Sequence, residues 1–358
     1  MFTWTENPIS EIWKQLKFIS YRENCRNLLI GKISSGRSLI FDAADASLER
    51  KVIEVSMCIQ QGIEYFCAAN QVTLNTSPLL VYYGMLSLAK AVIVANANNL
   101  FIDDIEYHGL SAKPNNEMLK EFRRNKSNWC IENEFAIVNG GVFNELNNVL
   151  APDSVLPTKS IIRVKDCLSC IPEIKELYEK YYGEHANSFD MYDELRQCQR
   201  DPSKIEFAVG PGENSEILFK YVPEIADNFN HYTEKMHGIA PYFCSKNNMA
   251  KESIDYFANY CSCVGGRYFL CGLKYELNGH IEKKIIDQAL IDYILLFILG
   301  EQVRYHQDFW GEMVQGEKSG TLGLLDVYLD IVKRRYPNEI LNKLFGERFT
   351  YGMPARFV

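Results

Sequence analysis

The sequence has no surplus of basic residues, and this limits the partners that it can bind. Its 358 residues include 38 Lys and Arg against 46 Asp and Glu, which gives a net charge of −8 at pH 7. A protein that coats nucleic acid needs a basic surface, so nucleic acid is not a favoured partner here. A local basic patch stays open as an alternative.

The N-terminal stretch lacks the features of a signal peptide. Export requires a basic head and an apolar run of about 7–15 residues, and neither is found here. The stretch instead has the spacing of an amphipathic helix, with apolar residues at Trp4, Ile9, Ile12, Trp13, Leu16 and Ile19. The 11 cysteines are scattered and odd in number. We therefore expect reduced thiols in a cytoplasmic protein.

Sequence signatures of catalysis are also missing. The chain contains no repeat, no Walker motif, no HExxH zinc motif and no Ser–His–Asp order. A CxxC pair begins at Cys167 and a CxC pair at Cys261. These could supply zinc or redox ligands, but the second pair lacks the usual spacer and neither follows a thioredoxin-like βαβ unit. We expect ordinary buried cysteines, no metal and no cofactor.

Two glycine-rich stretches, residues 210–214 and 265–267, could cradle a phosphate only if a helix followed each of them. Each is flanked instead by segments that resemble strands. We therefore predict hairpin turns at both places.

The most prominent feature of the sequence is one long apolar run. Residues 76–97 begin with Ser77 and Pro78, which are typical of a helix start, and continue with a single charge, Lys90. A helix that is apolar on nearly all faces is buried in a core or in a membrane. Lys90 and several polar residues favour the core of a water-soluble protein, so we predict no membrane span.

The neighbours of this helix are predicted from their spacing. Apolar residues recur every three or four positions over residues 44–70, which predicts a second long helix joined to the first as an antiparallel hairpin. Residues 22–40 are expected to form a loop and an edge strand. Helices are expected again from Glu282, over residues 322–334 and over residues 338–345, with Pro337 separating the last two.

The middle of the chain has mixed signals. Strands are predicted at residues 160–164, 205–210, 216–222 and 267–277, a hairpin-like piece at 135–143, a helix at 171–182 and a short polar segment at 118–124. The predicted fold is mostly α, a helical bundle with a small mixed α/β insertion. Its parts are the N-terminal helices at residues 1–130, the insertion at 131–280 and the C-terminal helices at 281–358.

Several motifs in this order resemble one family. They are SPLLVYYGMLSLAKA from Ser77, HGL from His108, VRYHQDFW from Val303 and RRYPNEILN from Arg334. Together they resemble the YaaC-like family of bacterial proteins over roughly residues 45–345. The resemblance implies no settled activity, and it suggests a place in bacterial antiviral defence loci. The helices are also distantly similar to HEPN domains, which often cleave RNA.

Four residues are candidates for a site. Lys90 is expected to pair with Asp287 or Asp292, or else to contact a phosphate. His108 is expected in a loop, where capping is the expected role and a divalent cation with Asp103 and Asp104 the weaker alternative. Arg304 and His306 are the catalytic candidates, although their spacing is shorter than the HEPN signature of Arg, four to six residues, then His.

The favoured function is a non-enzymatic interaction subunit of a bacterial defence or stress-response assembly. Its partners would be other protein subunits, with a homo-oligomer as one arrangement. The alternatives are a divergent HEPN-like ribonuclease that uses Arg304 and His306, and a sensor of a small, nucleotide-like anion held by Lys90, His108 and Arg304.

Overall fold

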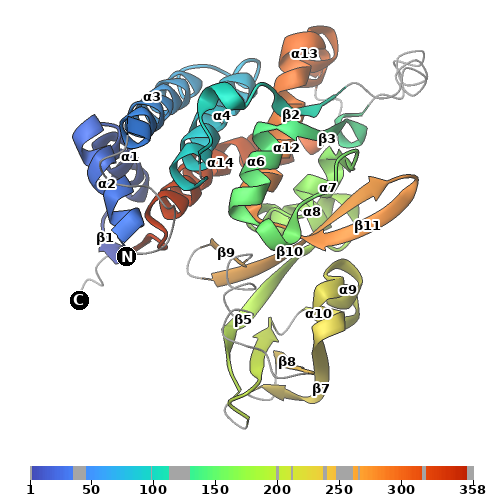
Figure 1. Ribbon diagram of the computed structural model, residues 1–358. Helices are drawn as coiled ribbons and strands as arrows, with labels where there is room; N and C mark the ends of the chain where they lie inside the picture. Colours follow the sequence, from blue (N-terminus) through green and yellow to red (C-terminus); the bar gives the residue numbers. More distant parts are fainter. Residues whose placement is uncertain are drawn as a thin grey trace, which may run out of the picture.

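The structure is a computed structural model of the whole chain. It describes residues 2–34, 46–97, 99–112, 130–198, 201–210, 213–236, 240–246, 261–264, 267–316 and 320–352. The segment at 118–124 and the turn at 265–266 lie outside this range. Figure 1 shows a helical part and, below it, a lobe built around β5 and β7.

The apolar run forms a buried helix, as predicted. Helix α4 (Ser77–Asn96) follows α3 (Ala46–Ala69) after a short turn, and the two lie antiparallel (Figure 1). They approach closely because glycine lies at the contact: a Cβ on Gly84 would come within 2.7 Å of the Phe66 ring. By length and composition α4 could cross a membrane, but 78% of its most apolar window is buried inside the protein.

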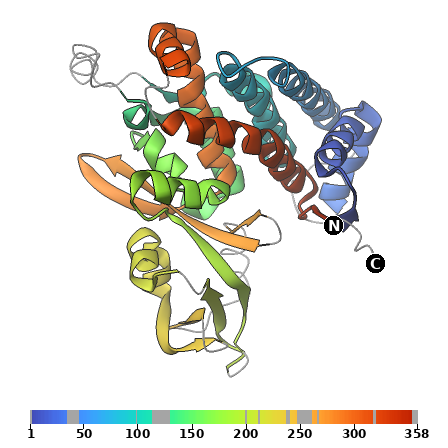
Figure 2. The ribbon, with the colours of Figure 1, turned by 180° about the vertical axis from the view of Figure 1, so that it is seen from behind.

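The other helices cover α4 from several sides. Helices α12 and α14 pack against it, while α1 and α2 pack on α3 (Figure 2). Their bounds are α1 (Pro8–Ile19), α2 (Arg22–Ser34), α12 (Gln288–Tyr305), α13 (Gln307–Gly316) and α14 (Thr321–Phe345). Two expectations were wrong. The loop expected after residue 22 is helix α2, and α14 continues through Pro337 as one helix.

A buried lysine explains why a loop was expected where helix α2 lies. The inward face of α2 carries Cys25, Leu29 and Lys32. The Lys32 amine donates to the carbonyl oxygens of Lys343 (3.2 Å) and Leu344 (3.0 Å), at the C-terminus of α14. A charged residue at an inward position broke the apolar spacing from which helices are predicted.

Ten strands of the described part form an antiparallel sheet in the order β2-β3-β4-β10-β5-β6-β8-β7, with β11 and β9 also paired to β10. The strands are β2 (His108–Ser111), β3 (Phe135–Gly141), β4 (Ile161–Arg163), β5 (Ser188–Gln197), β6 (Ile205–Val209), β7 (Phe229–Met236), β8 (Ala240–Ser245), β9 (Cys261–Val264), β10 (Arg267–Leu277) and β11 (His280–Ile285). The strands predicted near β4, β6 and β10 are confirmed. Because β2 precedes residue 131 and β11 passes residue 280, the sheet extends beyond the range predicted for the insertion.

Short helices lie between the strands. They are α6 (Val142–Leu150), α7 (Val164–Leu168), α8 (Lys175–Tyr182), α9 (Ser215–Tyr221) and α10 (Pro223–Asn228), with 3-10 turns at η1 (Ile102–Asp104), η3 (Ile131–Asn133), η4 (Pro152–Ser154) and η5 (Pro172–Ile174). The helix predicted at 171–182 is confirmed as η5 and α8.

Four expectations in this region were wrong. The strand expected at 216–222 is instead helix α9, because the Asn214 side chain caps it by accepting from the amides of Glu216 and Ile217. Because this helix follows β6, the hairpin turn expected at residues 210–214 was also wrong. The piece at 135–143 is one strand that turns directly into α6 at Gly141, where φ is +131°. Residues after Glu282 complete β11, and α12 begins only after Asp287, whose side chain caps it.

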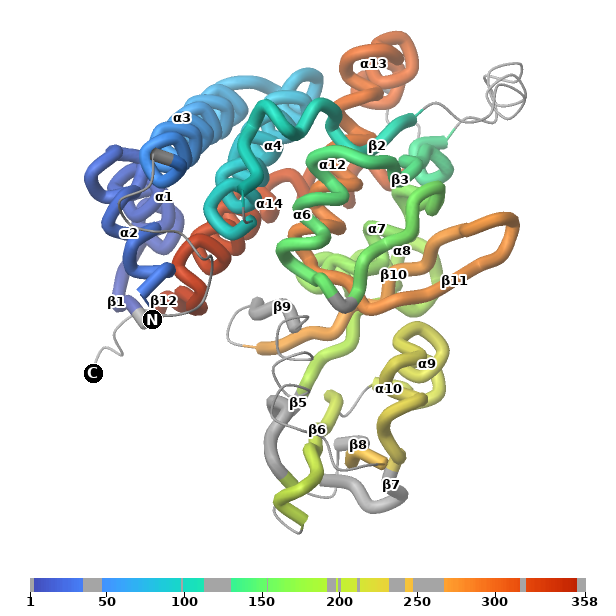
Figure 3. Tube along the Cα trace, in the orientation of Figure 1, coloured from blue at the N-terminus to red at the C-terminus, as the bar shows by residue number. Residues whose placement is uncertain are grey.

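The two ends of the described chain meet. Strand β1 (Phe2–Trp4) pairs in parallel with β12 (Thr350–Gly352), next to α1 and the end of α14 (Figure 3). The extended tail predicted after Arg348 is confirmed by β12. The fold is therefore mostly α, with one large antiparallel sheet.

Candidate functional site

Lys90, His108 and Arg304 come from three elements that meet. Lys90 lies in α4, His108 is the first residue of β2, and Arg304 is in the last turn of α12. Helices α4 and α12 pack against each other, and β2 is hydrogen-bonded to α12, in the upper part of Figure 1. The prediction of a loop around His108 was wrong, since the residue begins a strand. His306 ends α12 as its C-cap, and its ring lies 6.5 Å from that of Phe309.

The charges of Lys90 and Arg304 both act on His108. His108 is half-buried, and its pKa is lowered by burial first and then by the positive charges of Arg304 and Lys90. Both cations must lie near the imidazole for their charges to act on it. A lowered pKa keeps this histidine neutral at physiological pH.

Arg304 is held by two side chains. One terminal nitrogen, Nη1, donates to the Tyr83 hydroxyl at 2.7 Å, and Nη2 forms an ion pair with Glu301 one turn earlier in α12. Its Nε–H is buried and has no acceptor within the described residues. A buried donor that is left without an acceptor costs about 1–3 kcal/mol, so a site of this kind favours a ligand or water that can accept.

Tyr82 is a buried neighbour of His108. The residue is fully buried, which raises the pKa of its hydroxyl, and its ring lies 5.9 Å from the His108 ring. The neighbouring Tyr293 hydroxyl donates to the His108 carbonyl oxygen at 2.9 Å and so ties β2 to α12. The Tyr82 and Tyr293 hydroxyls also interact with each other, and this interaction adds to the burial that raises the pKa of Tyr293.

Lys90 is not paired with the acids that we expected. The Asp287 carboxylate pairs with Lys343 at 2.7 Å, and Asp292 pairs with Arg335. Across the described residues, no hydrogen bond or ion pair involves the half-buried Lys90 amine. Its charge is felt by His108 and by the buried Cys58 of α3. The expected pairing of Lys90 with Asp287 or Asp292 is therefore not found.

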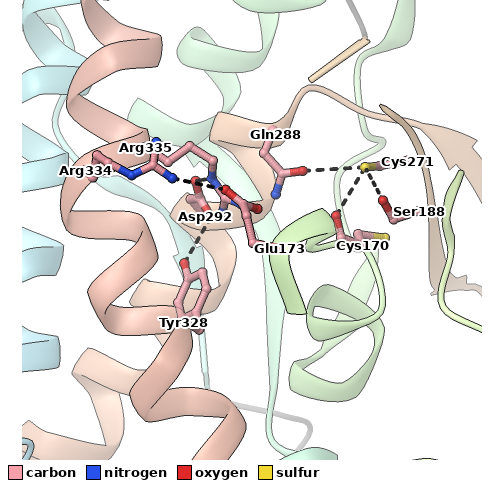
Figure 4. Close-up of polar contacts among 9 residues, drawn as sticks. All are labelled: Cys170, Glu173, Ser188, Cys271, Gln288, Asp292, Tyr328, Arg334 and Arg335. Carbon is pink, nitrogen blue, oxygen red and sulfur yellow. Dashed lines mark hydrogen bonds and ion pairs between the residues drawn. The ribbon is translucent and has the colours of Figure 1, made fainter. Parts of the chain in front are cut away.

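A second polar cluster is buried, and its charged side chains pair with one another. Arg335 of α14 lies between Asp292 of α12 and Glu173 of η5, with 2.5 Å from its Nη1 to Glu173, and the Tyr328 hydroxyl donates to Asp292 at 3.1 Å (Figure 4). Burial raises the pKa of Asp292 to about 6, against the charge of Arg335. This cluster joins elements of the fold, and we treat it as structural.

The remaining candidates have structural partners. Asp103 pairs with Arg50 at 2.9 Å, and Asp104 accepts from the Phe101 amide. Cys167 and Cys170 are buried, and burial raises the pKa of both thiols far above the usual range, which makes them unreactive. No group of three metal-ligating side chains was found among the described residues.

Sequence reasoning missed Glu301 and Tyr293. Glu301 stands three residues before Arg304, a spacing that places the two side chains together on a helix, so this pair could have been predicted. Tyr293 could not have been, because its role depends on β2 lying against α12.

Comparison with known proteins identifies one family. A family model described as YaaC-like Protein matches residues 20–344. No curated protein and no solved structure matches the chain.

Proposed function

The chain belongs to the YaaC-like family, and we propose that it is a binding protein for a small anionic ligand held by Lys90, His108 and Arg304. One observation carries this proposal. Two cationic donors, the Lys90 amine and the Arg304 Nε–H, have no acceptor in the described structure, and the charges of both side chains act on His108. An anion with several oxygen atoms supplies the acceptors that these groups lack.

The chemistry of the donors favours a phosphoryl or carboxylate group. Charge-assisted hydrogen bonds from Arg and Lys to such oxygens are about twice as strong as neutral ones. Aromatic rings surround the site: Tyr83 stacks on Tyr65 at 5.5 Å between ring centroids and lies beside Tyr82. Rings of this kind can pack against a nucleobase, which supports a nucleotide-like ligand.

The test is calorimetric titration of the purified chain with inorganic phosphate and with adenosine monophosphate. We expect saturable binding, and we expect Lys90→Met to weaken it by at least about 10-fold, or about 1.4 kcal/mol. Lys14→Met is the matched control, because Lys14 is exposed on α1 and should leave binding unchanged. Equal affinity in Lys90→Met and the unmutated chain would refute the assignment.

A protein-interaction subunit of a bacterial defence assembly is the second candidate. Its support is a set of large apolar side chains that are exposed in or next to α1, namely Trp4, Ile9, Phe18 and Tyr21. Scattered exposed apolar residues are common, but this many near one short helix is typical of a contact surface. Co-purification with the tagged native chain, repeated with Phe18→Ser and Tyr21→Ser, tests it: a partner retained by both variants would count against this surface.

A HEPN-like ribonuclease has less support. It would need Arg304 to act on a phosphodiester with His306, whereas the guanidinium is engaged by Glu301 and Tyr83. An Arg304→Ala, His306→Ala double variant that folds and loses RNA cleavage would favour the enzyme.

A further inference from the structure

We propose that Glu301 is a built-in competitor that occupies Arg304 until an anionic ligand displaces it. This inference rests on the proposed anion site and concerns its regulation. The Glu301 carboxylate is negatively charged and presents oxygen acceptors, as an anionic ligand does. It therefore binds the guanidinium that the ligand would use.

The geometry places the competitor inside the site. Glu301 and Arg304 are one turn apart on α12, and their side chains are only 15% and 20% exposed. The ion pair uses the Nη2 edge of the guanidinium, while Nη1 donates to Tyr83 and Nε has no acceptor. A bidentate ligand contacts a guanidinium through two neighbouring nitrogens. On Arg304, using Nε together with Nη2 requires Glu301 to leave.

The position of Glu301 makes its release unfavourable. It lies near the C-terminal end of α12, where the partial negative charge of the helix end repels a carboxylate. Arg304 offsets this repulsion as long as the pair holds. Once the ligand takes Arg304, Glu301 must turn toward water without a partner. The cost of that step lowers the apparent affinity, because the chain binds only in the fraction of molecules whose Arg304 is released.

Displacement also carries a signal out of the site. Arg304 lies in the last turn of α12, which ends at Tyr305 and His306 and leads directly into α13 (Gln307–Gly316). The guanidinium carbon lies 4.9 Å from the centre of the exposed Tyr305 ring. A ligand that rearranges Glu301 and Arg304 therefore acts at the junction of the two helices.

The test is a phosphate titration of Glu301→Gln, which keeps the shape of the side chain and removes its charge. We expect affinity to increase at least about 10-fold over the unmutated chain. Glu301→Asp is the second variant, because its shorter side chain reaches Arg304 less well, and it should give a smaller increase. Glu23→Gln, an exposed acid of α2, is the control and should change nothing.

The outcomes separate this inference from the function on which it rests. Suppose that the unmutated chain binds phosphate, that Lys90→Met does not, and that neither Glu301 variant binds it more tightly. The role of Glu301 as a competitor is then refuted, while the anion site is supported. If neither the unmutated chain nor the Glu301 variants bind phosphate or adenosine monophosphate, both are refuted. Should Glu301→Gln fail to fold by circular dichroism, the Glu301→Asp titration decides.

Discussion

His108 shows how a residue's neighbours can decide its chemistry. An exposed histidine is partly charged near neutral pH, but burial and two nearby cations keep this one neutral. It can therefore accept or donate one hydrogen bond at a site that already holds two positive charges. A bound anion would reverse the electrostatic balance and raise the His108 pKa again.

The pH dependence of binding follows from that reversal. In the free protein the His108 pKa is lowered, and with an anion bound it rises, so binding takes up a proton and affinity increases as the pH falls. Sulfate is the probe, since its charge is constant over this range. We expect calorimetry to show tighter sulfate binding at about pH 5.5 than at about pH 7.5.

His108→Gln should flatten this profile, whereas His280→Gln, on an exposed residue of β11, should leave it as it is. A slope that survives His108→Gln would assign the proton to another group.

At the scale of the element, two buried lysines donate hydrogen bonds to the C-terminal ends of neighbouring helices. Lys51 of α3 is 1% exposed, and its amine donates to the carbonyl oxygens of Val94 and Ala97, both at 2.6 Å, at the C-terminus of α4. The last carbonyls of a helix have no partners within it, and here a neighbouring helix supplies a donor. The same device joins Lys32 of α2 to the end of α14.

Replacing Lys51 should therefore destabilise α4. We expect Lys51→Met to lower the free energy of unfolding by about 1–3 kcal/mol, because the buried carbonyls lose a donor. Burial lowers the pKa of Lys51 from 10.5 to about 8, so above pH 8 the unfolded chain binds a proton that the folded chain has released. The stability that Lys51 provides thus increases from pH 8 toward 10.5.

Urea unfolding of Lys51→Met and of the unmutated chain at pH 7 and pH 9 measures this effect. The difference in free energy of unfolding between the two proteins should be larger at pH 9. A difference that narrows would contradict the burial of the charged amine. Lys14→Met, on an exposed side chain, should show no such trend.

Elements with a clear apolar spacing were predictable, and those with mixed spacing were not. The α3–α4 hairpin was found because its apolar residues recur without interruption. The alternation of Ile217, Phe219 and Tyr221 predicts a strand, whereas the side-chain cap by Asn214 makes this segment helix α9. Pro337 predicts a helix end, yet α14 continues through it, because tertiary packing overrides local propensity.

At the scale of the whole molecule, one buried ion-pair cluster joins distant parts of the chain. Arg335 connects Asp292 of α12 and Glu173 of η5 to α14 (Figure 4). A buried ion pair adds little net stability over apolar packing, but removal of one partner leaves a buried charge. We therefore expect Arg335→Met to cost about 3–5 kcal/mol in the free energy of unfolding.

Arg334→Met is the matched control, since the Arg334 side chain is 42% exposed, against 4% for Arg335, and its Nη2 lies 3.9 Å from Glu173. Its cost should stay below about 1 kcal/mol. The double variant Asp292→Asn, Arg335→Met should recover part of the loss, because it removes two buried charges together. Equal losses in Arg334→Met and Arg335→Met, measured by urea unfolding, would disprove the role of the cluster.

The convergence of the candidate site could be predicted only in part. Lys90, His108 and Arg304 were identifiable as polar residues in or beside apolar segments. Their meeting depends on α4, β2 and α12 packing together, which no local pattern records. The expected partners of Lys90 failed for the same reason, because Lys343 and Arg335 of α14 already hold Asp287 and Asp292.

The burial of α4 has a consequence for how the protein is made. The ribosome releases α4 long before α12 and α14, the helices that later cover it. During that interval the nascent chain exposes to water a segment that is apolar enough, by composition, to cross a membrane. Synthesis should therefore depend on a chaperone that shields this segment, and chains cut short before Gln288 should aggregate or be degraded.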